Sequence, residues 1–236
     1  MKILIADAKS LKENNYPISI NKPLFYDKSN LLIEKMKLLD YYQIHDLMKI
    51  SFKQAKIIEN YFRLDKDIAA LNLYNRVVFK QLQLSKYGSK EFNYLDKHLL
   101  IQSPLYGLVR YNDGIRYHRL EMKNDSRLYD YWDRDVNEYL KDEVIVSLST
   151  KEYEKMVCCD MIHVDFVVRV GNSFKRNAVY LKKARGMMLD YMILHQIEDI
   201  EMIKDIVVDG YRYSKEDSTE YHWLFIKEKS MKYIKL

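Results

Sequence analysis

The chain contains few of the residues that build flexible linkers or covalent cross-links. Its 236 residues include six glycines, three prolines and two cysteines. So few glycines and prolines leave no room for a flexible linker, and the length fits a single domain over residues 1–236. Cys158 and Cys159 are adjacent, an arrangement that rarely forms a disulfide and lacks the spacing of a zinc site. We therefore expect one domain with two free thiols.

Long apolar runs and clusters of metal ligands are also missing. No stretch approaches 18 apolar residues, and Met1 leads directly into a strand-like segment instead of an apolar signal segment. The six histidines are scattered, and no pair has helical ligand spacing with a carboxylate. The sequence thus predicts a soluble, cytoplasmic protein that uses no membrane span, no metal and no cofactor.

The chain carries a modest excess of positive charge, with 39 lysines and arginines against 34 acidic residues. The net charge of +5 favours an anionic partner, but many DNA-binding domains are more basic, and ordinary soluble enzymes share such an excess. The hydrophobic content of 48% is enough for a sizeable core. Charge alone leaves a nucleic-acid binder and an enzyme both open.

Hydrophobic periodicity predicts helices early in the chain and mixed strands later, which favours an α+β fold. Ser29, Ser51 and Asp65 are predicted helix caps, and Asp125 or Ser126 is a fourth. The predicted helices span residues 29–39, 43–50, 51–62, 65–82, 91–96, 126–139 and 187–196, with short ones beginning at Pro104 and after Thr150. The predicted strands span residues 2–6, 98–102, 117–122, 143–148, 162–170, 175–180, 206–213 and 222–226.

A first motif runs from Ser103 to Met122. Tyr106 and Gly107 read as a turn followed by the cation Arg110. Arg119 and Glu121 lie two residues apart on a predicted strand and should face the same side. They form either a buried charge pair or a cleft in which Glu121 acts as a general base oriented by Arg119.

A second motif places Lys182, Lys183 and Arg185 next to Gly186, at the predicted start of helix 187–196. Cations at a helix start oppose the helix dipole unless an anion sits there. The motif is therefore an anion site, to which the amides after Gly186 contribute, or else a solvated helix start. Lys9 follows the first predicted strand at its carboxyl end, and is a phosphate contact or a plain surface lysine.

These two motifs resemble the YaaA family of bacterial peroxide-stress proteins. The run from Lys182 to Gly186 matches the family pattern intact. Leu148, Glu152 and Tyr153 follow in the family's order. The matches in the first motif are Ser103, Leu105, Tyr106, Gly107, Arg110, Asp113, Arg119, Leu120, Glu121 and Met122. The departures are Ala6 and Asp7 in place of serine and proline, Pro104 in place of glycine, and a segment from Arg76 to Gln81 without the family's glycines.

The resemblance implies a central mixed β-sheet surrounded by helices, with a basic cleft and a helix-hairpin-helix-like element. It also implies a DNA-binding protein of the oxidative-stress response, which protects DNA under hydrogen peroxide and limits free intracellular iron. We therefore expect double-stranded DNA as the partner, bound without sequence preference and sensitively to salt. The expected phosphate contacts are Lys9, Arg110, Arg119, Lys182, Lys183 and Arg185.

An enzyme is the alternative. Carboxylates gathered among cations are typical of a catalytic cleft, so Glu121, Lys183 and Tyr106 are candidate catalytic residues. YaaA-like domains also occur in systems that install 7-deazaguanine bases in DNA, which implies a nucleobase or nucleotide substrate. An enzyme should hold Glu121 and Lys183 in one pocket, whereas a DNA surface should keep carboxylates away from the basic face. A purely structural domain also stays open, and the sequence predicts no oligomeric state.

Overall fold

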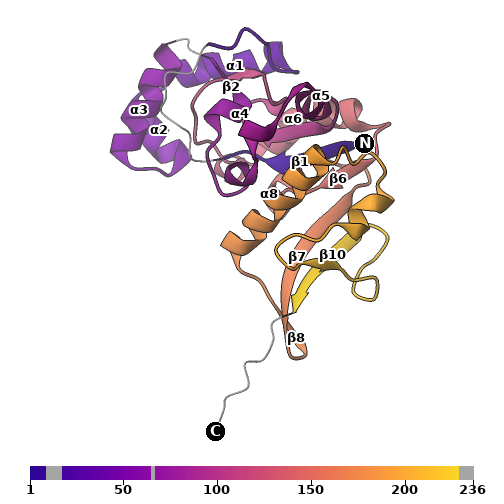
Figure 1. Ribbon diagram of the computed structural model, residues 1–236. Helices are drawn as coiled ribbons and strands as arrows, with labels where there is room; N and C mark the ends of the chain where they lie inside the picture. The colour runs from indigo at the N-terminus through magenta and orange to yellow at the C-terminus, as the bar shows by residue number, and fades with distance from the viewer. Residues whose placement is uncertain (9–17, 65–66, 229–236) are drawn as a thin grey trace.

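The protein is described by a computed structural model that covers residues 1–8, 18–64 and 67–228 (Figure 1). The centre of this part of the chain is a mixed eight-stranded sheet in the order β4-β3-β1-β6-β7-β10-β9, with β8 paired to β7. Five strands run parallel, and β4, β8 and β9 run antiparallel to their neighbours. The strands are β1 (Lys2–Ala6), β3 (Leu99–Ser103), β4 (Gly107–Val109), β6 (Ile145–Ser147), β7 (Ile162–Val170), β8 (Ser173–Lys175), β9 (Arg212–Tyr213) and β10 (His222–Glu228).

Helices surround this sheet, so the predicted α+β fold is confirmed. In Figure 1, α1 to α3 gather at one end, while α8 runs along β7 and the strands β7, β8 and β10 project away as an arm. The helices are α1 (Tyr26–Lys37), α2 (Tyr41–Met48), α3 (Phe52–Arg63), α4 (Ala70–Leu73), α5 (Ser89–His98), α6 (Arg127–Leu140), α7 (Lys151–Glu154) and α8 (Ala178–Leu194). Short 3-10 turns are η1 (Phe79–Gln81), η2 (Leu84–Lys86), η3 (Met122–Asn124) and η4 (Glu201–Asp205).

The strand order creates a topological switch point between β1 and β6. These two strands are parallel neighbours, but the chain leaves β1 toward β3 on one side and leaves β6 toward β7 on the other. The connections therefore diverge and open a crevice beyond the carboxyl ends of both strands, where ligands of such sheets bind. The crevice begins at Ala6 and Ser147, the last residues of the two strands.

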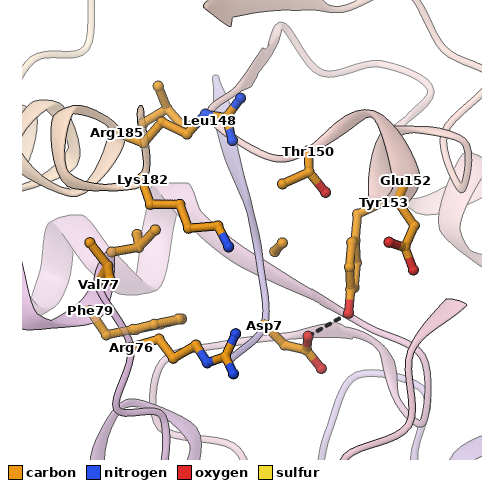
Figure 2. A pocket seen from close by; sticks show the side chains of 12 residues that line it. Asp7, Arg76, Val77, Phe79, Leu148, Thr150, Glu152, Tyr153, Lys182 and Arg185 are labelled. Atoms are coloured by element: carbon orange, nitrogen blue, oxygen red, sulfur yellow. Dashed lines mark hydrogen bonds between the residues drawn. The ribbon is translucent and has the colours of Figure 1, made fainter. Parts of the chain in front are cut away.

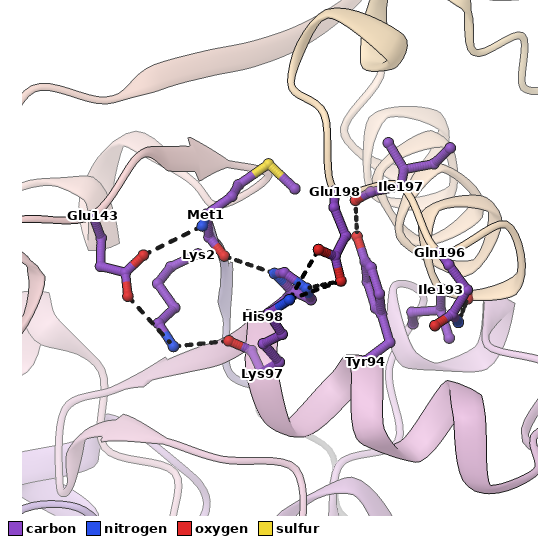
Figure 3. A network of polar contacts seen from close by, with 10 residues as sticks. All are labelled: Met1, Lys2, Tyr94, Lys97, His98, Glu143, Ile193, Gln196, Ile197 and Glu198. Atoms are coloured by element: carbon purple, nitrogen blue, oxygen red, sulfur yellow. Dashed lines mark hydrogen bonds and ion pairs between the residues drawn. The ribbon is translucent and has the colours of Figure 1, made fainter.

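A network of polar contacts surrounds the amino terminus, at the amino-terminal ends of the parallel strands (Figure 3). The amino group of Met1 lies 3.3 Å from a carboxylate oxygen of Glu143. Nδ1 of the buried His98 lies 2.8 Å from the Met1 carbonyl oxygen, and its Nε2 lies 3.3 Å from Oε1 of Glu198. The Tyr94 hydroxyl donates to the carbonyl of Ile197 nearby. These contacts join β1 and α5 to the end of α8.

The first motif folds as a β-hairpin, so the predicted helix at Pro104 is wrong. Strands β3 and β4 pair as far as Ser103 and Gly107, and residues 104–106 form the turn. Gly107 has φ +72, and a Cβ on it would lie 2.8 Å from the Trp132 ring. The Trp132 indole in turn donates a 2.8 Å hydrogen bond to the Pro104 carbonyl. Packing against α6 therefore selects the hairpin.

The predicted helix over residues 65–82 is also wrong. Strand β2 (Ile68–Ala69) pairs with β5 (Gly114–Ile115), and only four residues of α4 follow. The apolar residues of this segment have helical spacing, but pairing with β5 overrides that local preference. The predicted cap Asp65 lies outside the described residues. The predicted strand over residues 117–122 is absent from the described chain as well, because the chain there is irregular up to η3.

Helix α8 begins at Ala178, well before the predicted start at residue 187, and replaces the second half of the predicted strand 175–180. The Asn177 side chain caps it by accepting hydrogen bonds from the amides of Val179 and Tyr180. The cationic motif therefore lies inside the helix, so the predicted helix start at the motif is wrong. Neither the helix dipole nor the amides after Gly186 favour an anion there. Helix α1 likewise begins at Tyr26 instead of being capped by Ser29, whose hydroxyl donates to the Tyr26 carbonyl.

Candidate functional site

A cavity of about 150 Å³ lies at the switch point (Figure 2). The end of β1, the segment after β6, helix α7, the segment leading into η1, and α8 all contribute to its walls. Because these segments are far apart in sequence, the cavity is a product of the tertiary fold. Its lining consists of Ala6, Asp7, Arg76, Val77, Val78, Phe79, Leu148, Thr150, Glu152, Tyr153, Lys182 and Arg185.

One side of the cavity is acidic and rigidly held. The Tyr153 hydroxyl donates a 2.6 Å hydrogen bond to Oδ1 of Asp7. Gln102 on β3 braces both residues, because its carbonyl accepts from the Asp7 amide at 3.0 Å and its Nε2 donates to the Tyr153 carbonyl at 2.8 Å. Burial and the neighbouring Asp7 carboxylate raise the pKa of the Tyr153 phenol. Tyr153 therefore remains a hydrogen-bond donor at physiological pH.

The other side is cationic. Arg76, Lys182 and Arg185 reach toward the same space from the segment before η1 and from α8 (Figure 2). Burial lowers the pKa of the Arg185 guanidinium, against the opposing effect of the Asp165 and Glu154 carboxylates. The Nε atom of Arg185 is buried and has no hydrogen-bond partner among the described residues.

Gly186 allows α8 and the segment leading into η1 to pack closely together. A Cβ on Gly186 would overlap the carbonyl oxygen of Val78 and lie 2.8 Å from Cγ of Gln81. Only glycine lets α8 approach η1 this closely. The glycine of the second motif therefore acts through packing, and it brings Arg185 next to the segment that carries Arg76.

A second, larger hollow of about 780 Å³ lies on the arm, between the start of α8 and strands β7, β8 and β10. We call it the basic groove. Lys175 and Lys183 are exposed on it, and Arg176 is exposed while paired with Asp165 at 3.0 Å. Lys227 is paired with Asp209 at 3.2 Å. The lining consists of Val168, Val170, Lys175, Arg176, Asn177, Tyr180, Lys183, Asp209, Tyr211, Lys227 and Glu228.

The predicted phosphate contacts separate into different places. Lys182 and Arg185 line the cavity, whereas Lys183 lines the basic groove. Arg110 lies apart, where its Nε donates to the fully buried carboxylate of Asp113 at 2.9 Å. Arg119 is half-buried in the irregular chain between β5 and η3. Lys9 lies outside the described residues.

The three candidate catalytic residues do not line one hollow together. Tyr106 is buried in the core, where its hydroxyl accepts a 2.8 Å hydrogen bond from the Arg116 amide and burial raises its pKa. Glu121 is buried before η3, with Oε2 3.0 Å from Nζ of Lys123. Lys183 is exposed on the basic groove.

Asp7 and Arg76 were not predicted as site residues from the sequence. Asp7 follows β1 directly, so the rule that selected Lys9 at the carboxyl end of a strand applies to it equally. Arg76 had no such signal, because its segment was predicted to be helical. Both are positions where the chain departs from the family pattern, and the fold gathers them with the matching positions Tyr153, Lys182 and Arg185.

Metal and redox features are sparse in residues 1–8, 18–64 and 67–228. No group of three or more histidine, cysteine, aspartate or glutamate side chains is arranged there to hold a metal ion. Cys158 and Cys159 are free thiols. A hydrogen bond to Asp133, burial and the Asp133 charge raise the pKa of Cys158.

No helix in the same part of the chain is long and apolar enough to cross a bilayer.

The fold and the cavity together define an α+β protein whose mixed sheet carries a cationic cavity at its switch point, beside a basic groove. The family described as "Peroxide stress protein YaaA" matches residues 1–217. The chain belongs to this YaaA family. It is 34% identical to the UPF0246 protein of Fusobacterium nucleatum over 98% of this chain and 100% of that protein. It is 30% identical to the UPF0246 protein of Clostridium beijerinckii, over 97% and 98% of the two chains.

Proposed function

We propose that this peroxide stress protein is a cytoplasmic protein that binds double-stranded DNA through its phosphates, and that the basic groove is the binding surface. The observation that carries the proposal is the exposure of Lys175, Arg176 and Lys183 on one groove, from β8, the following turn and α8. Lysine and arginine at such a surface neutralise phosphates without reading bases. We therefore expect affinity with little sequence preference.

The distribution of charge around the groove supports this use. Four cations line it against two carboxylates, Asp209 and Glu228. Asp209 is already paired with Lys227, and Glu228 lies 3.5 Å from Nε of Arg169. Arg110 is omitted from the proposed surface because its guanidinium is bound to Asp113 and to the Lys22 carbonyl.

The test is a salt series of duplex binding, measured by fluorescence anisotropy. Each phosphate contact contributes about −0.9 to the slope of log affinity against log salt, so Lys175→Gln with Lys183→Gln should flatten the slope by about 2. Lys141→Gln removes one charge outside the basic groove, between α6 and β6, and should leave the slope unchanged. Identical slopes for the wild type and the double variant would exclude the groove.

The proposal includes protection of DNA under hydrogen peroxide and limitation of free iron, which rest on family membership. Nicking of a supercoiled plasmid by ferrous iron and peroxide tests both. If protection requires DNA binding, the double variant should lose it. If the protein protects by lowering free iron, the double variant should protect as well as the wild type.

An enzyme acting on a nucleobase or nucleotide is the second candidate. Glu121 does not line the basic groove that holds Lys183, so the pocket first expected for the two residues does not support it. The observation that still favours it is the cavity, where the Tyr153 hydroxyl and the Asp7 carboxylate face three cations. Release of a base or a phosphate from an oligonucleotide, abolished by Asp7→Asn, would support the enzyme; unchanged oligonucleotide would count against it.

A further inference from the structure

The cavity contains a cation with an unsatisfied hydrogen-bond donor. Arg185 is half-buried on α8, and its buried Nε has no hydrogen-bond partner among the described residues, although the Asp165 and Glu154 carboxylates act on its charge. Burying a charged group without hydrogen bonds costs free energy, and an anion within reach would remove that cost. Arg185 therefore points to an anionic ligand.

Two further cations line the cavity together with Arg185. Lys182 lies on the same helix and Arg76 on the facing segment, and Figure 2 shows both side chains directed into the cavity. Arginine presents a planar fork that matches phosphate oxygens, while lysine adds a compact charge. Two cationic forks and an ammonium group suit a doubly charged phosphate better than a singly charged carboxylate.

The carboxylates that line the cavity are held by protein groups. Asp7 accepts from the Tyr153 hydroxyl, and Oε1 of Glu152 accepts a 3.1 Å hydrogen bond from the Lys123 amide. Both lie across the cavity from Lys182 and Arg185 in Figure 2. The cavity therefore has a cationic side, where the Nε of Arg185 has no hydrogen-bond partner among the described residues, and an acidic side that is held in place.

The remaining walls are apolar, and the space is small. Val77, Phe79 and Leu148 line it, and its volume is about 150 Å³. That space holds a phosphate group and part of a small organic group, which the apolar side chains would contact.

We propose that this cavity binds a small phosphomonoester, with the phosphate against Arg76, Lys182 and Arg185 and the organic group against Val77, Phe79 and Leu148. This site is separate from the DNA surface proposed above and does not depend on it. Lys182 contributes to the cavity and the next residue, Lys183, to the groove.

The test is isothermal titration calorimetry with inorganic phosphate and with phenyl phosphate. The wild type should bind both, and phenyl phosphate more tightly because its ring reaches the apolar walls. Lys182→Gln should weaken both at least tenfold, as expected for loss of a charge-assisted hydrogen bond of about 1.5–3 kcal/mol. Arg76→Gln, in another segment, should do the same and guards against a local folding defect of α8. Lys141→Gln is the matched control, and its affinities should equal those of the wild type.

Asp7→Asn tests whether the charge of the cavity affects its affinity for phosphate. Removing a negative charge near the phosphate should tighten phosphate binding several-fold, whereas an incidental effect on folding would weaken it. The proposal is wrong if the wild type binds neither probe, or if Lys182→Gln and Arg76→Gln bind like the wild type. Its failure is distinguishable from failure of the DNA proposal, because Lys183→Gln should reduce DNA affinity while leaving phosphate affinity within twofold.

Discussion

The hydroxyl of Tyr153 donates a 2.6 Å hydrogen bond to Oδ1 of Asp7, although the two residues are 146 positions apart. Asp7 directly follows β1, and Tyr153 belongs to α7, which follows β6. The bond therefore joins the ends of the two strands that define the switch point. It fixes one wall of the cavity.

Tyr153→Phe should lower the free energy of unfolding by about 2 kcal/mol, because a buried hydrogen bond to a carboxylate is lost. Urea denaturation followed by circular dichroism measures the change. Tyr221→Phe is the matched control, since Tyr221 is 47% exposed and its loss should have little effect. Equal stability of Tyr153→Phe and the wild type would mean that the bond does not contribute to the folded state.

Gly186→Ala should destabilise the protein by about 2 kcal/mol, because the added methyl group overlaps the Val78 carbonyl and forces α8 away from η1. This reverses the usual rule, by which alanine stabilises a helix interior by about 1 kcal/mol relative to glycine. Gly88→Ala, at the N-cap of α5, is the control for an added methyl group without overlap, since the nearest atom to its Cβ is 3.5 Å away, and should cost only the weaker N-cap preference of alanine. Thermal unfolding of both variants decides the sign.

Stability should decrease on acidification because of His118. This side chain is buried, and burial lowers its pKa from 6.5 to about 4. Between these values the unfolded chain binds a proton that the folded protein excludes, so stability is full above pH 6.5 and falls as the pH drops toward 4. The contribution lost is about 3 kcal/mol. Urea titrations from pH 7.5 to 4.5 should show a shallower decline for His118→Phe; parallel curves would contradict the assignment.

The exposed thiol of Cys158 should react slowly with peroxide and with iodoacetamide at neutral pH, because its raised pKa keeps it protonated. Its Sγ lies 3.4 Å from Oδ1 of Asp133. Asp133→Ala, in a Cys159→Ser background, should therefore accelerate alkylation of Cys158 several-fold. Mass spectrometry of timed samples measures the rates, and an unchanged rate would exclude Asp133 as the cause.

Elements with strong local signals were predicted well from the sequence. Strand β7 has the predicted bounds 162–170, because its alternating pattern ends at a glycine turn. Helix α6 buries the predicted face of Leu128, Trp132 and Val136. Ser51 caps α3 as expected, by accepting from the Gln54 amide.

The errors arise where distant segments decide the structure. Residues 65–82 have a helical pattern, but pairing of β2 with β5 prevents the helix. The run of cations at residues 182–185 looked like a boundary, whereas the Asn177 cap starts α8 earlier. In the candidate site, too, the residues with a local motif were predicted and the contacts between distant segments were not. Lys182 and Arg185 were identified from their motif, but their partnership with Arg76 and Asp7 depends on a contact at Gly186 that no local pattern encodes.

The contact at Gly186 also fixes the rotation of α8 about its own axis. Consecutive residues on a helix point about 100° apart, so Lys182 and Lys183 necessarily face different directions. With the helix held against η1, that angle directs one lysine into the cavity and the next onto the groove. Two neighbouring lysines of the same chemistry therefore line two different hollows, because of the angular pitch of the helix and the contact that holds it.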